Sequence, residues 1–427
     1  MLESEAEEQL SRRWIVYRIC VCLGLLFGML FSWQLWLSDG REFPVLPCLG
    51  LGKLSAPFDW ILLLGTLALA GGAIARVWDR WIVAGLAVLL VVLGLLDQMR
   101  WQPWAYQYLL CFIPMAFVAQ RSDREGIAAV LDLGRLLIIA TYVWSGIHKF
   151  GVQFQRTYRS DVVDNWLEST SGWLHELIVW NGYLVPWVEI LIGLGLLLPW
   201  TRQLAIYLAI GTHAFILVTL GPLGAGSNSV IWPWNLGMVG IVLALFWRLR
   251  GFALVDLFSV RRLQPVAVVI GVLVVLMPAR SVSGKWHQYF SFHLYSGHHQ
   301  RLSLMVSNQR AAQIEAIYTE IMTVATPQPG QDPTHRELSI GNWSYRELNV
   351  PMPSENRILL GVAKELVERF DLGPADYFYR DYPELLRERG YDVYSPTKIR
   401  GMGKFPPFRQ QLSAQQIEQL DQAAKRR

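Results

Sequence analysis

The sequence predicts an all-α polytopic membrane bundle of about nine transmembrane helices, followed by a small C-terminal α+β domain outside the membrane. Three observations support this class. Of the 427 residues, 53% are hydrophobic and only 17% are charged, whereas soluble domains carry about 25% charged residues. Long apolar runs recur as far as residue 279, and ordinary polarity returns from Arg280 onward. We therefore expect a membrane domain over residues 1–280 and a soluble domain over residues 281–427.

The apolar runs define the expected spans. A helix needs about 20 mostly apolar residues to cross the hydrocarbon core, and somewhat fewer inside a bundle. The fourth run is the shortest and contains Pro114. The expected spans cover residues 14–37, 59–76, 81–97, 105–120, 130–149, 184–200, 203–221, 230–247 and 264–279.

The distribution of Lys and Arg between the spans predicts the orientation, because cytoplasmic loops carry the excess. With the N-terminus inside, the inner segments carry eleven such residues: Arg12, Arg13, Arg76, Arg80, Arg121, Arg124, Arg202, Arg248, Arg250, Arg261 and Arg262. The outer loops carry six: Arg41, Lys53, Arg100, Lys149, Arg156 and Arg159. The comparison favours a cytoplasmic N-terminus. An odd number of spans then puts the C-terminal domain outside.

The C-terminal segment has the pattern of a small α+β domain. QYFSFHLYS (288–296) and RLSLMVS (301–307) predict two strands around the turn SGHHQ. The run SENRILLGVAKELVERFD (354–371) repeats apolar residues at helical spacing. These elements together predict the α+β class.

Several function classes lack their sequence signals. The net charge is +4 without a basic stripe, so no nucleic-acid partner is expected. The four cysteines form no CxxC pair. Four histidines lie close together at His287, His293, His298 and His299, but adjacent histidines rarely chelate one ion, and no metal site is predicted. Hydrolase, P-loop, HExxH and Rossmann patterns are absent.

Polar residues within the apolar runs mark a candidate site. An ionisable group in hydrocarbon costs about 2.5–3.5 kcal/mol on insertion scales, and it normally indicates function or a buried pair. His148 and Lys149 end the fifth expected span at its outer side. Glu189 and Asn235 lie near the outer ends of the sixth and eighth spans, and His213 lies in the middle of the seventh. These residues are therefore expected around one pocket, roughly 5–10 Å below the outer face.

Lys149 is the candidate catalytic base of this pocket, with His148 beside it. In an apolar pocket the lysine ammonium loses its solvation, and a neutral amine can act as a general base. A nearby Glu189 has the opposite effect and keeps the lysine charged. Glu189, His213 and Asn235 are the expected substrate-binding residues.

Each of these residues also has a structural alternative. Lys149 can extend to the lipid headgroups, and Glu189 can neutralise a neighbouring cation. His213 can be a hydrogen-bonded core histidine, and Asn235 can satisfy backbone groups freed by the adjacent proline. Arg135, at the inner end of the fifth span, is expected to be structural.

Four stretches carry a resemblance to a known family. YVWSGIHKF (142–150), LLDQMRWQPWAYQYLL (95–110), VPWVEILIGLGLLLPW (185–200) and YLAIGTHAFILVTLGPLG (207–224) resemble motifs of the HTTM (horizontally transferred transmembrane) domain proteins. These are bacterial relatives of the vitamin K-dependent gamma-glutamyl carboxylase. The resemblance covers roughly residues 10–280.

The resemblance implies a cofactor, a location and roles for two residues. Lys149 would be the base that deprotonates a vitamin K-like hydroquinone, and His213 would belong to the quinone site. The family topology agrees with a cytoplasmic N-terminus and an extracytoplasmic C-terminal domain in a bacterial inner membrane. The expected partners are membrane lipid and either a quinone or another membrane protein.

Three function hypotheses remain at this point. The first is an enzyme with a lyase or oxidoreductase-like activity on a quinone or lipid-like substrate in an outer-leaflet pocket. Glutamate gamma-carboxylation itself is not favoured, because residues 281–427 are too few to hold a peptide substrate. The second is a non-catalytic membrane scaffold or assembly partner that presents the C-terminal domain outside. The third is a transporter.

Overall fold

The computed structural model describes residues 2–48, 54–118, 121–159, 162, 172–221, 228–249, 251–252, 254–297, 299–317, 334–382 and 390–403. The chain divides into two compact units. The first contains Met1–Gly40 and Pro47–Gly297, and the second contains Arg41–Leu46 and His298–Arg427.

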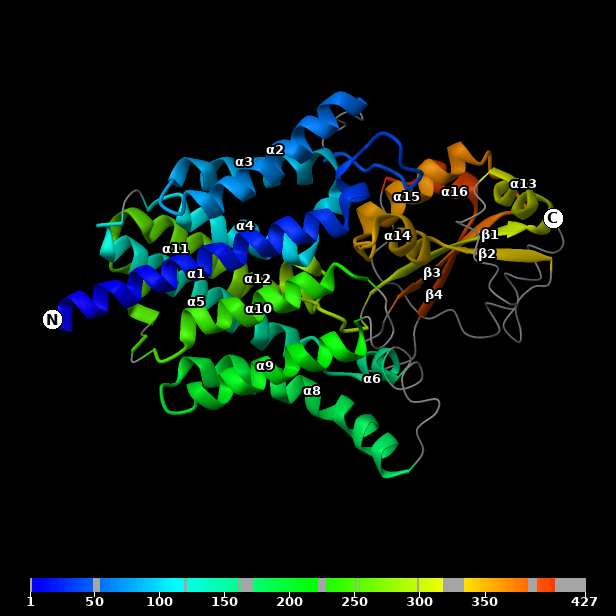
Figure 1. Ribbon diagram of the computed structural model, residues 1–427. Helices are drawn as coiled ribbons and strands as arrows, with labels where there is room; N and C mark the ends of the chain where they lie inside the picture. Colours follow the sequence, from blue (N-terminus) through cyan, green and yellow to red (C-terminus); the bar gives the residue numbers. More distant parts are fainter. Residues whose placement is uncertain are drawn as a thin grey trace. The chain divides into compact units, whose positions relative to one another are not determined.

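The first unit is a helical bundle built around α5 (Figure 1). In the most apolar 18-residue stretch of α5, 83% of the residues are buried, compared with 28% in the corresponding stretches of α2 and α8. Helix α5 is therefore the central helix. Helix α5 packs against α8, and α1 packs against α10. The main helices are α1 (Leu2–Phe31), α2 (Ala56–Ala75), α3 (Arg80–Leu96), α4 (Pro103–Met115), α5 (Arg124–Ile147), α6 (Val152–Tyr158), α8 (Trp173–Leu197), α9 (Arg202–Thr219), α10 (Ile231–Phe246), α11 (Gln264–Gly271) and α12 (Met277–Ser281).

Short helical turns connect these elements. A π-helical turn, η7 (Val272–Leu276), joins α11 to α12 into one apolar segment. The remaining turns are η1 (Trp33–Trp36), η3 (Gln98–Arg100), η5 (Leu254–Phe258), η6 (Arg261–Leu263) and η8 (Tyr289–Ser291).

Within the described residues, six helical segments are long and apolar enough to cross a membrane. They are Glu7–Phe31, Ala56–Ala75, Arg124–Ile147, Glu176–Leu197, Arg202–Thr219 and Arg261–Ser281. Two more apolar helices, α3 and α10, have 17 and 16 residues. Helix α4 has only 13 residues, contains Pro114 and is buried along almost its whole length, as expected for a core helix. The predicted count of about nine spans is therefore not confirmed.

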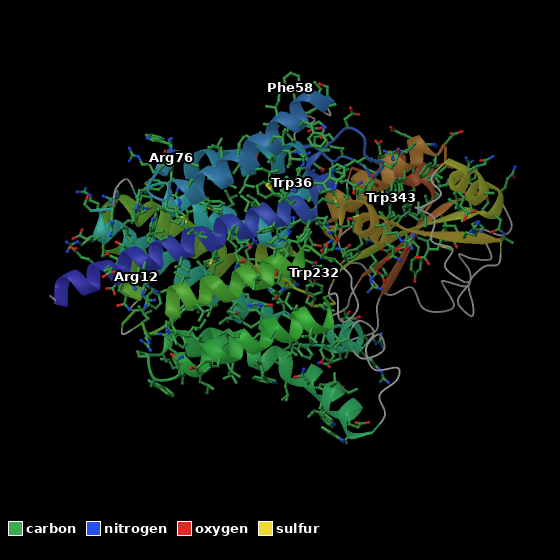
Figure 2. All side chains as sticks on the ribbon, in the orientation of Figure 1. Arg12, Trp36, Phe58, Arg76, Trp232 and Trp343 are labelled. Carbon is green, nitrogen blue, oxygen red and sulfur yellow. The ribbon has the colours of Figure 1, made fainter. Side chains whose placement is uncertain are left out.

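A buried arginine stabilises one end of the bundle. The Arg100 guanidinium donates to the carbonyl oxygens of Leu35 and Trp36 at 3.1 and 2.9 Å, and its Nη2 lies 3.8 Å from the Asp59 carboxylate. Asp59 also accepts from the backbone N–H of Ser38 at 2.6 Å. Figure 2 shows Trp36 among the bundle side chains, whereas Phe58 on α2 is 59% exposed. Arg100 was assigned to an outer loop from the sequence, but its side chain is enclosed.

The second unit is an α+β fold around one antiparallel sheet. The strand order is β2-β1-β3-β4. The strands are β1 (Arg301–Ser307), β2 (His335–Ser339), β3 (Tyr377–Tyr382) and β4 (Gly390–Tyr394), and the helices are α13 (Asn308–Ile317), α14 (Ile340–Leu348), α15 (Asn356–Arg369) and α16 (Pro396–Gly401). The helix predicted at 354–371 is confirmed as α15, which buries Ile358, Leu359, Val362 and Leu366.

The predicted hairpin between 288–296 and 301–307 is wrong. Only the second segment is a strand, and β1 pairs with β2 and β3 instead. The first segment forms the turn η8, and Phe292 adopts a positive φ of 59°, which breaks an extended strand. Phe290 stacks on Tyr106 of α4 at a centroid distance of 4.3 Å. Packing against the bundle therefore overrides the local strand pattern. His298 of the predicted turn lies outside the described residues.

Candidate ligand-binding cavity in the helical bundle

Two glycines bring α5 and α8 into close contact. A Cβ on Gly146 would lie 2.6 Å from the Pro186 carbonyl oxygen, and one on Gly193 would lie 2.9 Å from the Ile139 carbonyl oxygen. Small residues at such positions let helix backbones approach closely in a membrane. This contact places the ends of the Lys149 and Glu189 side chains within hydrogen-bonding reach.

Lys149 and Glu189 form a buried ion pair at this contact. The Lys149 Nζ lies 2.7 Å from Glu189 Oε2 and 2.6 Å from the Ser145 Oγ. A third acceptor, the Ser145 carbonyl oxygen, lies at 3.5 Å. Both residues of the pair are at least 94% buried. The three acceptors match the three hydrogens of an ammonium group, so in this arrangement Lys149 acts as a donor.

His213 links α5, α9 and α10 through a short polar chain. Its Nε2 lies 2.6 Å from the Tyr142 hydroxyl, and its Nδ1 lies 2.7 Å from Asn235 Oδ1. Asn235 donates its amide hydrogen to the Ile231 carbonyl oxygen at 2.7 Å, which leaves its Oδ1 as the acceptor. A neutral imidazole here therefore carries its proton on Nδ1, and Nε2 accepts from the Tyr142 hydroxyl.

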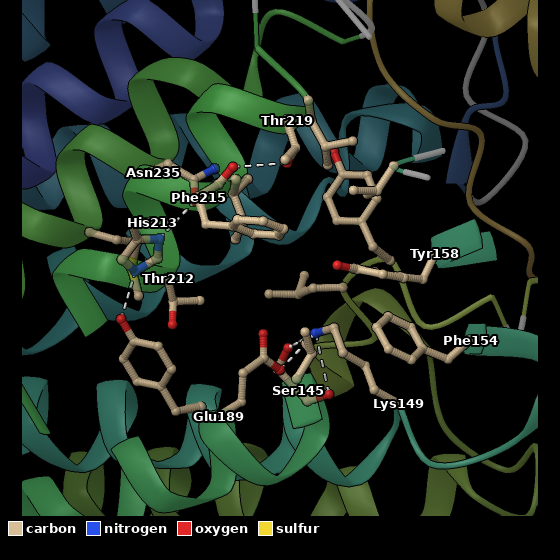
Figure 3. Close-up of a pocket in the computed structure, with 18 of the residues that line it drawn as sticks. Ser145, Lys149, Phe154, Tyr158, Glu189, Thr212, His213, Phe215, Thr219 and Asn235 are labelled. Carbon is tan, nitrogen blue, oxygen red and sulfur yellow. Dashed lines mark hydrogen bonds and ion pairs between the residues drawn. The ribbon is translucent and has the colours of Figure 1, made fainter. Parts of the chain in front are cut away.

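The ion pair and the His213 chain line the same cavity (Figure 3). About 130 Å³ is open to the centre of a water molecule, well above the volume that a single water needs. The lining side chains are Thr141, Tyr142, Ser145, Lys149, Phe154, Thr157, Tyr158, Val162, Val185, Glu189, Thr212, His213, Phe215, Ile216, Thr219, Leu220, Trp234, Asn235, Met238, Leu294 and Tyr295.

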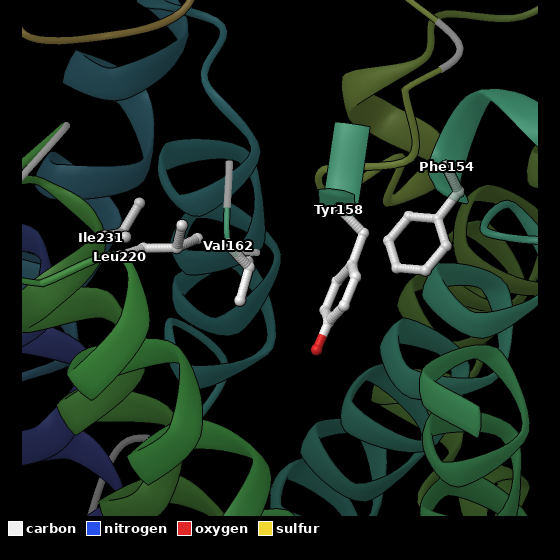
Figure 4. Packing of buried hydrophobic residues seen from close by; sticks show 5 residues of the cluster. All are labelled: Phe154, Tyr158, Val162, Leu220 and Ile231. Carbon is white, nitrogen blue, oxygen red and sulfur yellow. The ribbon is translucent and has the colours of Figure 1, made fainter. Parts of the chain in front are cut away.

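Hydrophobic side chains of α6 and of the residues that follow α6 and α9 form one wall of the cavity. Phe154, Tyr158, Val162, Leu220 and Ile231 make a buried cluster (Figure 4). The first four of these also line the cavity. Such a cavity, with apolar walls and few convergent polar groups, is typical of small-molecule sites.

Two groups at the cavity retain hydrogen-bonding capacity. No residue that the structure describes donates a hydrogen bond to Glu189 Oε1, whereas Oε2 accepts one from Lys149. The Tyr158 hydroxyl accepts from Asn181 at 3.1 Å, so its own hydrogen remains for another acceptor. Burial raises the pKa of Tyr158, which keeps the phenol protonated. The cavity therefore offers an acidic acceptor and a phenolic donor to one ligand.

The sequence-predicted site residues separate into two places. Lys149, Glu189, His213 and Asn235 all line the cavity. His148 is not among the lining residues, because consecutive residues on a helix point to different faces. Its ring stacks on that of His293 at a centroid distance of 3.6 Å, and its Nε2 lies 3.5 Å from the Ser281 Oγ.

Sequence reasoning missed two residues that complete the site. Ser145 contacts Lys149, and Tyr142 contacts His213. Both lie in the same helical run as Lys149, four and seven residues before it, so helical spacing places all three on one face. That spacing was the signal that could have identified them.

Comparison with known proteins gives one family match. The family model of methylamine utilisation protein MauE, a membrane protein family, matches residues 127–230, about a quarter of the chain. The matched segment contains Lys149, Glu189 and His213. No curated protein and no solved structure matches this chain.

The family match corrects the resemblance inferred from the sequence. The identification with HTTM proteins and the vitamin K-dependent carboxylase is wrong, because the matching segment is similar to MauE instead. Short apolar motifs with a few aromatic and basic residues recur in unrelated membrane helices, so they discriminate poorly between families. The apolar helices and the likeness to a membrane family make this chain an integral, polytopic membrane protein.

Proposed function

We propose that this protein binds a quinone or another lipid-like ring compound in the cavity between α5, α8, α9 and α10. The single observation that carries the proposal is the cavity itself, whose largely apolar wall surrounds the buried Lys149–Glu189 pair. A ring compound fits the apolar wall, and an oxygen on the ring can reach the polar groups. The reduced, hydroxyl-bearing form is favoured because Glu189 Oε1 can accept its hydrogen.

The Lys149–Glu189 pair is the proposed acid–base unit for this ligand. Proton abstraction by Lys149 requires that its ammonium first gives a proton to Glu189 across the 2.7 Å contact. Filling the cavity with an apolar ring favours this transfer, because a buried ion pair loses the solvation that stabilises its charges. Lys149 is then a neutral amine and a general base. The Tyr158 hydroxyl can donate to a second oxygen of the ligand, and His213 and Asn235, which are bonded to each other, line the same cavity.

Binding of three related rings to the purified protein tests the proposal. The probes are 1,4-dihydroxynaphthalene, 1,4-naphthoquinone and 1,4-dimethoxynaphthalene, measured by titration calorimetry in detergent. We expect saturable binding of the first two, with the dihydroxy compound tighter. The dimethoxy compound is expected to bind more weakly by about five- to tenfold, since the one hydrogen bond that it loses contributes about 1–1.4 kcal/mol.

Two variants sharpen this measurement. The double variant Lys149→Met/Glu189→Gln removes both charges together and should abolish the preference for the dihydroxy ring. Lys285→Ala is the matched control, because Lys285 is an exposed lysine of the same unit. Absence of saturable binding by all three rings to the folded wild type would contradict the proposal. The scaffold hypothesis would then be preferred.

We also propose that the N-terminus is cytoplasmic, and that the second unit is extracytoplasmic in a bacterial inner membrane. The Lys and Arg distribution between the apolar segments supports a cytoplasmic N-terminus. The extracytoplasmic second unit follows if the short helix α4, which lies between α3 and α5 in the chain, also crosses and makes the number of crossings odd. C-terminal fusions to alkaline phosphatase and to green fluorescent protein test it. An active phosphatase with a dark fluorescent protein is expected, and the reverse pattern would invert the orientation.

A further inference from the structure

A second cavity lies beside the N-terminal half of α5, whereas the first cavity lies beside its C-terminal half. It is lined by side chains and backbone of Gln9, Leu10, Arg13, Ala128, Asp132, Arg135, Leu249, Gly251, Phe252 and Asp256. About 220 Å³ of it is open to the centre of a water molecule. Arg135 precedes Lys149 by 14 residues, so these two residues are separated by about 21 Å along the direction of α5.

The arginines of this cavity are fixed by the C-terminal end of α10. Arg13 donates to the carbonyl oxygens of Ala244 and Trp247 at 3.0 and 2.5 Å. The Nε of Arg135 donates to the Leu245 carbonyl oxygen at 3.0 Å. These bonds satisfy carbonyl groups that a helix end leaves unpaired. They also hold two cationic side chains against the cavity.

The central ion pair leaves one atom of each partner unused. The Arg135 Nη1 bonds to Asp132 Oδ1. Among the described residues, no acceptor lies within bonding distance of Arg135 Nη2, and no donor bonds to Asp132 Oδ2. Both atoms keep some accessible surface, although the Arg135 residue is 95% buried and the Asp132 residue is 92% buried. A buried guanidinium edge and a carboxylate oxygen therefore both open into the cavity.

The charges of the cavity favour a ligand that carries both signs. Arg13 and Arg135 supply two positive charges, and Asp132 and Asp256 supply two negative charges. A simple anion would be attracted by the two arginines but repelled by the two carboxylates. A simple cation would be attracted by the carboxylates but repelled by the arginines. A zwitterion can place its anion on the guanidinium edge and its ammonium group on the carboxylates. An arginine fork binds phosphate well.

The surface beside the cavity favours a lipid as the source of that zwitterion. One turn after Arg13, a row of exposed apolar side chains starts on α1. Val16, Leu23 and Leu30 are 45%, 39% and 44% exposed and are spaced by seven residues, which keeps them near one face of the helix. This row extends for about 21 Å, so it can lie against acyl chains whose headgroup enters the cavity.

We propose that this cavity binds the phosphoethanolamine headgroup of a membrane phospholipid. The phosphate lies on Arg135 Nη2 with Arg13 near it, and the ammonium group donates to Asp132 and Asp256. A phosphocholine group has no such hydrogens to donate, and a phosphoglycerol group has no positive charge. The site therefore discriminates phosphatidylethanolamine from phosphatidylcholine and from phosphatidylglycerol.

Native mass spectrometry of the purified full-length chain tests this inference. The protein is equilibrated in detergent with an equimolar mixture of the three lipids, which carry identical acyl chains. We expect phosphatidylethanolamine to be retained over each of the others by about two- to fivefold, the range that one solvent-accessible ion pair gives. Equal retention, or preference for phosphatidylglycerol, would overturn the proposal.

Variants and a soluble competitor complete the test. The double variant Asp132→Asn/Arg135→Gln removes both charges of the ion pair, and Asp256→Asn neutralises an exposed carboxylate. Both variants should lose the preference for phosphatidylethanolamine. Their unfolding temperatures are measured separately to confirm that they are folded. Arg76→Gln, at an exposed arginine, should keep the preference. Addition of O-phosphoethanolamine distinguishes the sources. If it displaces the lipid at a similar concentration, the headgroup alone is the ligand and the lipid assignment is wrong.

Discussion

Two buried ion pairs in the bundle differ in what surrounds them. Arg100 and Asp59 are 1% exposed, and their remaining polar atoms bond to the backbone and to Ser38. Lys149 and Glu189 are only slightly more exposed, at 5% and 6%, but they line a cavity, and Glu189 Oε1 has no donor among the described residues. Burial of a charge therefore does not distinguish a site from a structural bond. Unused bonding capacity beside an open volume does.

The largest expected effect is at the enclosed pair. Arg100→Met leaves Asp59 without its cationic partner, and it removes the donor to three carbonyl groups. Breaking a buried pair on one side costs about 3–5 kcal/mol. The free energy of unfolding in detergent is expected to fall by that amount. Arg76→Met, at an exposed arginine, is the matched control and should change little. A similar loss in both variants would contradict the structural role of Arg100.

The pair at the cavity should tolerate the equivalent change better. Lys149→Met leaves Glu189 unpaired, but water in the cavity can solvate the carboxylate, so we expect a loss of about 1–3 kcal/mol. The double variant with Glu189→Gln should recover most of that stability, because both charges are gone. Thermal unfolding of the two single variants and the double variant measures the coupling. A double variant less stable than Lys149→Met would mean that the charges support the fold rather than a ligand.

Separating α5 from α8 should reduce stability less than the changes above, and it should also weaken ligand binding. Gly146→Ala places a methyl group 2.6 Å from the Pro186 carbonyl oxygen, so the helices must separate. One added carbon in a packed contact costs about 1 kcal/mol. We expect that loss, together with weaker binding of 1,4-dihydroxynaphthalene. Gly65→Ala is the control, since a Cβ there meets no atom within 4 Å. Unchanged binding in Gly146→Ala would separate the helix contact from the site.

The smallest effect is expected at a lysine outside both pairs. Lys285 is exposed, and substitutions at such positions usually stay within about 0.5 kcal/mol. Lys285→Ala should therefore match the wild type in unfolding temperature and in ring binding. A large loss would show that removal of any lysine destabilises this protein in detergent. The Lys149 results would then need a different control.

The sequence alone was sufficient for part of the candidate site. Lys149, Glu189, His213 and Asn235 were placed near one level because an apolar helix rises about 1.5 Å per residue, and all four line one cavity. The same reasoning included His148, which faces another side of α5. It left out Tyr142 and Ser145, which share the face of Lys149. Depth along a helix was readable from the sequence, whereas the direction of a side chain around it needs the helical angle as well.

What the sequence by itself determined is the membrane character, the approximate positions of the apolar helices and the α+β class of the last third. These follow from local composition and periodicity, which act within one segment of chain. Only the tertiary structure decided that Arg100 is enclosed, that residues 288–296 pack on the bundle instead of pairing as a strand, and that Lys149 meets Glu189. Each of these depends on contacts between segments far apart in sequence, and the energy of a buried polar group is set by the partner that such a contact supplies.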